Sequence, residues 1–171
     1  MSNLDFSILL PYAGLLPSAL KITMIIGLCG FVLAVIISTV VGSLRSKKLP
    51  KPLSFILTAY VEFFRGTPLL VQVFVVYYGI PAFGIKIDPM VAAIITMGLN
   101  SGAYLSENIR AAIMSVDKGQ YEAAELLGYS PLQTTIHIVI PQAMRIVIPA
   151  FMNGFSSMVK ETSIISVLPV I

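Results

Sequence analysis

Oppositely charged residues interrupt three long apolar segments of the sequence. They are Glu62 with Arg65, Glu107 with Arg110, and Lys160 with Glu161. Members of the first two pairs are three residues apart and would share one face of a helix, whereas adjacent residues on a helix point in different directions. A charge at membrane depth costs about 2.5 to 3.5 kcal/mol, so such residues pair with each other or line a wet path. The three sites therefore predict either structural ion pairs or a polar path between apolar helices.

Enzyme and metal chemistry find little support in the sequence. It contains one histidine, His137, and one cysteine, Cys29, without the nucleophile and base or the ligand spacing that catalysis or metal binding requires. We expect no metal site, assign no role to His137, and interpret Cys29 as a small packing residue. The chain also lacks the G-x-x-x-x-G-K-[ST] loop that cradles nucleotide phosphates. An ATP-hydrolysing motor is therefore excluded as the identity of this chain.

Composition indicates an integral membrane protein. Of its 171 residues, 57% are apolar and only 11% are charged, whereas soluble domains carry roughly a quarter charged residues. Mean hydropathy is +0.92. The net charge of +3 is informative mainly through its distribution along the chain, because basic residues beside membrane spans set their orientation. The basic pI is therefore no argument for nucleic-acid binding.

Four segments are long and apolar enough to cross a bilayer, which takes about 20 residues. They cover residues 18–44, 53–80, 90–114 and 149–171. The connection 45–52, RSKKLPKP, carries four basic residues and no acid, which places it in the cytoplasm and the N-terminus outside. We expect residues 1–171 to form a single all-α, polytopic transmembrane bundle with a cytoplasmic loop at 115–148.

Several residues modify this simple picture of the spans. Small residues that would permit close helix contact recur in the first span, at Gly27, Gly30, Ala34 and Ser38. Gly66 and Pro68 should bend or break the second span, because proline removes a helical hydrogen bond. In the third span, counting about 1.5 Å per residue places Glu107 near the cytoplasmic interface.

The most distinctive stretch is the polar insertion between the last two spans. Asp117 is suited to cap a short helix that Gly128 would end, and Ser130 with Pro131 would begin another. We expect the second piece to be interfacial, because Pro141 and Pro149 interrupt it. The insertion thus predicts two short helices joined at an elbow.

These features together resemble the inner-membrane permease subunit of binding-protein-dependent ABC importers for polar amino acids. The motifs that carry the resemblance are Glu122-Ala123-Ala124 with Gly128, Ile140-Pro141-Gln142-Ala143, Arg65-Gly66-Thr67-Pro68 and Lys160-Glu161-Thr162-Ser163. The resemblance covers the chain from about Leu15 to its end. It implies a type I importer fold with five core spans. We count about four, so a fifth span is expected and is missing from this chain.

The resemblance also implies partners and a mechanism. The elbow would dock into a groove of a separate ATPase dimer, with contacts from Tyr121, Glu122, Ala123, Ala124, Leu127 and Gly128. That ATPase would bind the ATP and Mg, leaving no cofactor in this chain. A second permease subunit, identical or related, and an external amino-acid-binding protein would complete an inner-membrane importer working by alternating access. The alternative for Glu122 is a solvated residue that favours the first helical turn.

Polar residues of the spans are the candidates for the substrate pathway. An amino acid needs an acceptor for its ammonium group and donors for its carboxylate, and the candidates are Asn100, Tyr104, Glu107, Lys160, Glu161 and Thr162. The alternative is that Lys160 and Glu161 hold neighbouring spans together, as the pairs Glu62 with Arg65 and Glu107 with Arg110 are expected to do. A non-transporting scaffold or a small helical channel is the alternative function.

Overall fold

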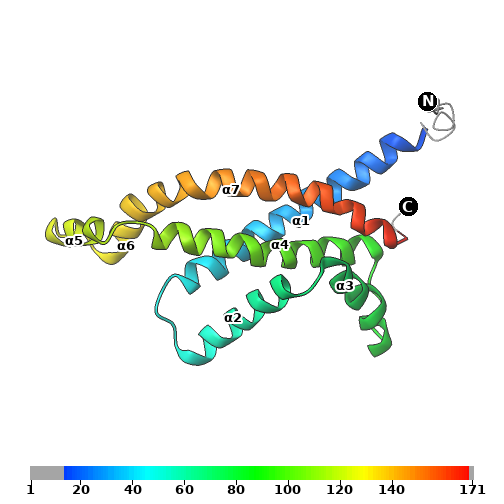
Figure 1. The fold of residues 1–171 in the computed structure, drawn as a ribbon, viewed down its shortest axis with the longest axis horizontal. Helices are drawn as coiled ribbons and strands as arrows, with labels where there is room; N and C mark the ends of the chain where they lie inside the picture. Colours follow the sequence, from blue (N-terminus) through cyan, green and yellow to red (C-terminus); the bar gives the residue numbers. More distant parts are fainter. Residues whose placement is uncertain (1–13, 170–171) are drawn as a thin grey trace, which may run out of the picture.

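The computed structural model describes residues 14–169, which are helical with short connections and contain no strand. The α-helices are α1 (Leu16–Arg45), α2 (Lys51–Gly66), α3 (Leu69–Phe74), α4 (Pro89–Met114), α5 (Lys118–Leu126), α6 (Pro131–Thr134) and α7 (Ile140–Glu161). Figure 1 shows α1, α4 and α7 running along the long axis of the molecule, with α5 and α6 at one end. The predicted all-α class is confirmed.

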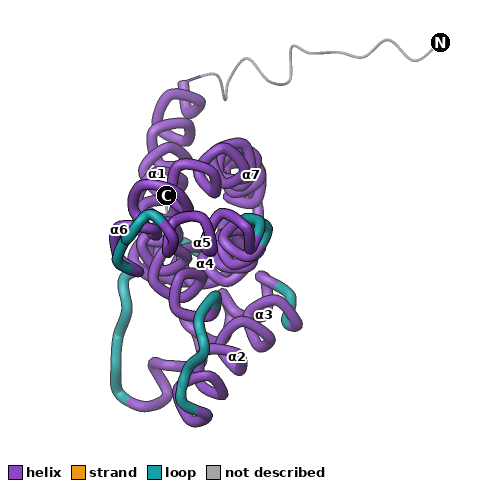
Figure 2. Tube along the Cα trace, turned by 90° about the vertical axis from the view of Figure 1, so that its left-hand side faces the viewer, coloured by secondary structure: helices purple, strands orange, loops and turns teal. Residues whose placement is uncertain are grey.

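Helix α4 is the centre of the fold. It contacts α1, α2, α3 and α7, and its contact with α1 is the most extensive in the chain. The two helices approach closely at small buried residues of α1, and Cβ atoms at Gly30 and Gly42 would meet atoms of α4, whereas one at Gly27 would meet Val159 of α7. A Cβ atom at Gly42 would lie 2.6 Å from the Ser106 carbonyl oxygen. The end-on view in Figure 2 shows α2 and α3 to one side of α1, α4 and α7.

Within residues 14–169, two helical stretches are long and apolar enough to cross a membrane, or three if the bent pair formed by α2 and the 69–83 segment is one span. The first is Leu16–Arg45, and the second runs from Pro131 to Val167. Helix α4 has 26 residues, long enough for a span, but it falls outside this set. Its lower hydropathy follows from polar residues that face other helices, including the buried Thr96, Asn100 and Ser106.

The second predicted span is broken. Helix α2 ends at Gly66, and the stretch Leu69–Phe83 continues at an angle of 108° to it. Thr67 and Pro68 between them are extended. The bend lies where Gly66 and Pro68 predicted it, so the segment 53–80 is two helices and not one straight span.

The fourth predicted span begins earlier than expected. The helix that contains it starts at Pro131, so the non-helical part of the predicted loop 115–148 ends at Ser130. Pro141 does not break this helix, because it follows a π-helical turn, Thr135–Val139, in which the Ile140 amide donates to the Thr135 carbonyl five residues back. The wider turn accommodates the proline ring, which would otherwise clash with the carbonyl four residues before it. Pro149 lies inside α7. The expected interruption of the helix at Pro141 and Pro149 is therefore wrong, whereas the position of this piece relative to the membrane stays a prediction.

Candidate functional site

The elbow between α5 and α6 is built from local capping interactions. The Asp117 carboxylate accepts a hydrogen bond from the Gly119 amide at 2.7 Å and starts α5. At the other end Gly128 has φ +78, and the amides of Gly128 and Tyr129 donate to the carbonyls of Glu125 and Ala124. This is a Schellman motif, which favours glycine because other residues are strained at positive φ. The Asp117 and Gly128 caps were both predicted from the sequence.

Helix α6 begins with a capping box, also at a predicted position. The Gln133 amide donates to the Ser130 hydroxyl at 3.3 Å, and the Gln133 side chain accepts from the Ser130 amide at 2.8 Å. Pro131 occupies the first turn, where its missing N–H costs nothing. The shape of the elbow is therefore fixed by hydrogen bonds between residues of the chain itself.

Apolar side chains project from this elbow. Leu126 is 89% exposed, Leu127 76% and Leu132 69%. Of the predicted contact residues, Tyr121, Glu122, Ala123, Leu127 and Gly128 are exposed. Ala124 is 1% exposed, so its side chain is unavailable to a partner, and its expected contact role is corrected. Leu126 was missed, although its place beside Leu127 before the cap glycine is a usable signal.

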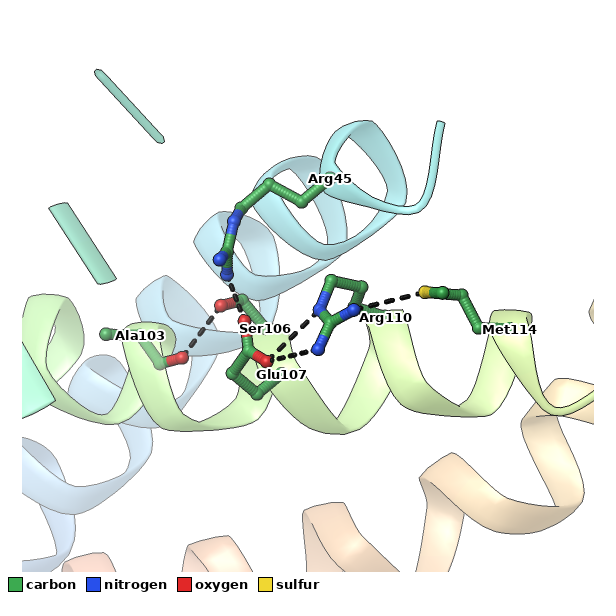
Figure 3. A network of polar contacts seen from close by, with 6 residues as sticks. All are labelled: Arg45, Ala103, Ser106, Glu107, Arg110 and Met114. Carbon is green, nitrogen blue, oxygen red and sulfur yellow. Dashed lines mark hydrogen bonds and ion pairs between the residues drawn. The ribbon is translucent and has the colours of Figure 1, made fainter. Parts of the chain in front are cut away.

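One carboxylate joins two arginines near the same end of the bundle (Figure 3). The Glu107 Oε2 atom accepts from Arg110 Nη2 at 2.9 Å and from Nε at 3.1 Å. Its other oxygen accepts from Nη1 of Arg45, the last residue of α1. The predicted spacing thus brings Glu107 and Arg110 together, while Arg45 was missed because it lies 62 residues away in sequence. The triad ties the end of α1 to α4.

The predicted pair of Glu62 and Arg65 does not form. Within residues 14–169 the ion pairs are those of Glu107, and both side chains of this expected pair are exposed. The Arg65 guanidinium lies over the Tyr104 ring, 5.4 Å from its centroid. Helical spacing permits the pair but does not enforce it, because each side chain can adopt another rotamer.

Side chains satisfy the backbone where α2 breaks. In a continuous helix the amide of residue 68 would donate to the Phe64 carbonyl, but Pro68 has no N–H. The Gln72 side chain donates to this carbonyl at 3.0 Å and the Asn100 side chain at 3.1 Å. Asn100 also donates to the Gln72 side-chain oxygen at 3.0 Å, and both residues are buried. One turn further along α4, the Tyr104 hydroxyl donates to the Arg65 carbonyl at 3.2 Å. We call Gln72, Asn100 and the Phe64 carbonyl the amide clamp.

A polar cleft of about 640 Å³ lies between the break, α4 and α7. Three predicted pathway residues line it, namely Asn100, Tyr104 and Glu161. Further polar lining residues are Thr67, Ser101, Asn108, Asn153 and Ser157. Asn153, Ser157 and Glu161 recur at four-residue intervals, which places them along one face of α7, and this spacing is the signal that would have found the first two. Glu161 is the charged residue of the lining, so the cleft offers a carboxylate among amides and hydroxyls.

The remaining predicted pathway residues lie elsewhere. Lys160 and Thr162 line a second hollow of about 440 Å³ beside the start of α1, and the Thr162 hydroxyl donates to the Val159 carbonyl. Glu107 is engaged by the two arginines and is not part of the cleft lining. Neither Lys160 nor Glu161 forms an ion pair within residues 14–169, so the structure gives no support within the chain to their role as a link between spans. The adjacent residues Lys160 and Glu161 thus line two different hollows.

The chain matches one known family over most of its length. Residues 30–169 match the family described as binding-protein-dependent transport system inner membrane component. The L-cystine transport system permease protein TcyB of Bacillus subtilis is 40% identical over 152 residues, covering 89% of this chain and 64% of that protein. The arginine transport system permease protein ArtQ of Bacillus subtilis is 38% identical over 167 residues, covering 97% of this chain and 76% of that protein. The chain therefore spans between about two thirds and three quarters of these relatives.

Solved structures agree with this assignment. A crystal structure of an amino acid ABC transporter with histidines contains a chain that is 36% identical, with a TM-score of 0.88 over 96% of this chain and 77% of that one. The inward-facing MetNI methionine ABC transporter gives a TM-score of 0.65 at 20% identity over 90% of this chain and 74% of that one, a likeness of fold alone. The chain belongs to the family of binding-protein-dependent transport system inner membrane components, and its similar relatives are amino-acid ABC permeases.

Proposed function

We propose that this chain is the membrane subunit of an ATP-driven importer that moves polar amino acids across the inner membrane by alternating access. The observation that carries the proposal is the helix Pro131–Val167, which begins at the exposed elbow and carries Glu161 into the polar cleft. One helix thereby joins the elbow, which is the proposed contact with the ATPase, to Glu161, which is the proposed contact with the substrate. The relatives named for L-cystine and arginine transport support an amino-acid cargo.

The elbow is the proposed contact with a separate ATPase. Exposed leucines at Leu126, Leu127 and Leu132 supply an apolar surface, and Glu122 and Tyr121 add polar contact. Insertion of such a helix into a groove of a partner is a common mode of recognition. ATP and Mg would be bound by that ATPase, and its closure would move two permease subunits between outward-open and inward-open forms. An external binding protein would deliver the amino acid.

The cleft is the proposed path of the substrate. The Glu161 carboxylate is an acceptor for an ammonium group, and the amides of Asn108 and Asn153 can donate to a carboxylate. The proposed orientation puts the basic connection 45–52 and the elbow in the cytoplasm and the N-terminus outside, following the positive-inside rule.

The test is uptake by the full-length chain, reconstituted in vesicles with its ATPase and binding protein. We expect Glu122→Arg and Leu126→Ser to lower both uptake and transport-linked ATP hydrolysis, because each removes contact at the elbow. Lys86→Glu, an exposed change in the loop at the opposite end, is the control and should transport normally. Unchanged uptake and hydrolysis in both elbow variants would overturn the coupling proposal.

Substrate contact is tested separately by Glu161→Gln. This variant should change the relative uptake of a panel of radiolabelled amino acids without changing assembly with the ATPase. An unchanged profile would assign Glu161 to structure. Isolation of the chain as a lone pore or scaffold, without ATPase or binding protein, would instead support the alternative function.

A further inference from the structure

Gln72 lies behind the polar cleft and holds two of the residues that line it. Its side chain is 4% exposed and is not part of the cleft lining. Its Nε2 atom donates to the Thr67 hydroxyl at 2.7 Å and to the Thr67 carbonyl at 3.0 Å, and its Oε1 atom accepts from Asn100 Nδ2 at 3.0 Å. Thr67 and Asn100 both line the cleft. The orientation of these two lining residues therefore depends on Gln72.

The hydrogen bonds of Asn100 fix which of its atoms faces the cleft. An asparagine side chain has two N–H donors on its nitrogen and one acceptor oxygen. The nitrogen donates to the Phe64 carbonyl at 3.1 Å and to Gln72, so both donors are used. The Asn100 oxygen accepts no hydrogen bond within residues 14–169, yet no side-chain polar atom there is both sealed from solvent and unpaired. The oxygen is therefore accessible, and Asn100 presents an acceptor to the cleft.

Two hydroxyl groups beside Asn100 also present acceptors. The Tyr104 hydroxyl donates to the Arg65 carbonyl at 3.2 Å, and the Thr67 hydroxyl donates to the Phe63 carbonyl at 2.8 Å. A hydroxyl group has a single hydrogen, so each oxygen keeps only lone pairs for a ligand. The Arg65 guanidinium lies over the Tyr104 ring and is not part of the cleft lining. We call Thr67, Asn100 and Tyr104 the acceptor end of the cleft.

Glu161 lies at the level of the acceptor end. Helices α4 and α7 run side by side in opposite directions (Figure 1), and a Cβ atom at Gly154 would lie 2.9 Å from Leu105 Cδ2. Counting along both helices from this contact places Asn100 opposite residue 159, two residues or about 3 Å of rise from Glu161. Among the described residues, the cleft lining contains no lysine, arginine or histidine. A substrate group at this end therefore meets a carboxylate and oxygen acceptors, which favour an N–H donor and repel another acceptor.

We propose that Gln72 is a positioning residue that holds the Asn100 oxygen toward the cleft, and that the acceptor end selects amino acids whose side chains carry N–H donors. The inference rests on the proposed function, because it assigns a substrate class to the proposed path. All amino acids share the ammonium and carboxylate groups, so the acceptor end discriminates between them through the side chain. Without the Gln72 oxygen, the Asn100 amide can turn its nitrogen to the cleft and donate to an acidic side chain.

The experiment measures amino-acid binding to the full-length chain in complex with its ATPase, in detergent and without the external binding protein. Each amino acid is titrated against the melting temperature of the complex to obtain its Kd. Glutamine, asparagine, lysine and arginine form the donor set, and glutamate and aspartate form the acceptor set. We expect the donor set to bind about tenfold or more tightly than the acceptor set, the order expected for one hydrogen bond to a charged group.

Gln72→Glu and Gln72→Leu are the matched pair of variants. Both remove the nitrogen that donates to Thr67 and to the Phe64 carbonyl, but Gln72→Glu keeps an oxygen acceptor for the Asn100 amide. We expect Gln72→Glu to keep the ratio of the two affinities and Gln72→Leu to bring it toward one. A purely structural role would lower the stability of both variants and leave the ratio unchanged in both.

Tyr104→Phe keeps the test decisive if the Gln72 variants do not assemble. It removes another oxygen of the acceptor end without changing Gln72 or Asn100, and it should also bring the ratio toward one. Equal affinities for the two sets in the unchanged chain would overturn the inference, as would an unchanged ratio in Tyr104→Phe or in an assembled Gln72→Leu complex. If no amino acid raises the melting temperature while the complete importer still takes up amino acids, this inference fails and the proposed function stands.

Discussion

The Asn100 side chain donates to the Phe64 carbonyl oxygen at 3.1 Å, replacing a hydrogen bond that Pro68 cannot make. A residue that the sequence marked only as a pathway candidate is thus also a support for the broken helix. With Gln72 it donates to a backbone carbonyl that lacks its helical donor. The break between α2 and α3 is consequently a built feature with its own hydrogen bonds.

The amide clamp predicts a measurable dependence on Pro68. Asn100→Leu and Gln72→Leu should each lower the free energy of unfolding by about 1 to 3 kcal/mol, the cost of leaving a buried polar group unpaired. The measurement is thermal stability in detergent, followed by size-exclusion chromatography after heating. When Asn100→Leu and Gln72→Leu are combined in a Pro68→Ala background, they should lower the free energy of unfolding by less, because the amide of residue 68 becomes available to the Phe64 carbonyl. Equal loss in both backgrounds would show that the clamp serves another purpose.

Close packing of α1 on α4 predicts that Gly42 tolerates no side chain. A Cβ atom there would lie 2.6 Å from the Ser106 carbonyl and 2.8 Å from the Ile109 Cβ atom, both on α4. Gly42→Ala should therefore lower stability by about 1 to 3 kcal/mol, as overpacking does. Gly66→Ala is the matched control, because a Cβ atom there meets nothing within 4 Å. The same thermal assay distinguishes them, and similar melting of both variants would contradict the packing argument.

The charge triad predicts coupling between α1 and α4. Glu107→Gln leaves the guanidinium groups of Arg45 and Arg110 together without an acid, and we expect a loss of about 1 to 3 kcal/mol, typical of hydrogen bonds to charged groups. The partial exposure of Arg110, 33% for its side chain, keeps this below the cost of a fully buried pair. Arg45→Met should cost less in the Glu107→Gln background than alone. Additive losses in the double-mutant cycle would mean that the two residues do not interact.

The capping box predicts local stability at the elbow. Ser130→Ala removes the side-chain acceptor for the Gln133 amide and should cost about 1 kcal/mol. Hydrogen exchange of the amides of residues 132–134 is the direct measurement, and faster exchange there is expected. Ser54→Ala is the control, because that exposed hydroxyl makes no hydrogen bond within residues 14–169. Unchanged exchange in Ser130→Ala would mean that α6 is stabilised by the rest of the helical stretch Pro131–Val167 and not by the capping box.

Local chemistry explains why the elbow and the bend were predictable. Asp117, Gly128 and Ser130 contact backbone groups within three or four residues of themselves, so the nearby sequence is enough to predict their roles. Pro68 likewise acts on its own turn. The long helix α1 followed from length and composition alone.

Other features depend on partners that sequence spacing does not reveal. The contact of Arg45 with Glu107 and the gathering of Asn108, Asn153 and Glu161 in one cleft arise only when helices pack. The helix break predicted at Pro141 was wrong because a π-helical turn before it preserves the helix. The partner contact predicted for Ala124 was wrong because an amphipathic pattern does not show which side of a short helix is covered by the rest of the chain.

The unbroken helix from Pro131 to Val167 has a mechanical consequence. With 37 residues it measures about 55 Å. Tilting a rod of that length by about 5° about one end displaces the other end by about 5 Å, close to one helical turn. Glu161 lies near the far end, so under the proposed coupling a small rotation at the elbow would displace it by a distance comparable to the size of an amino-acid side chain. The displacement for a given rotation would grow with the length of the helix.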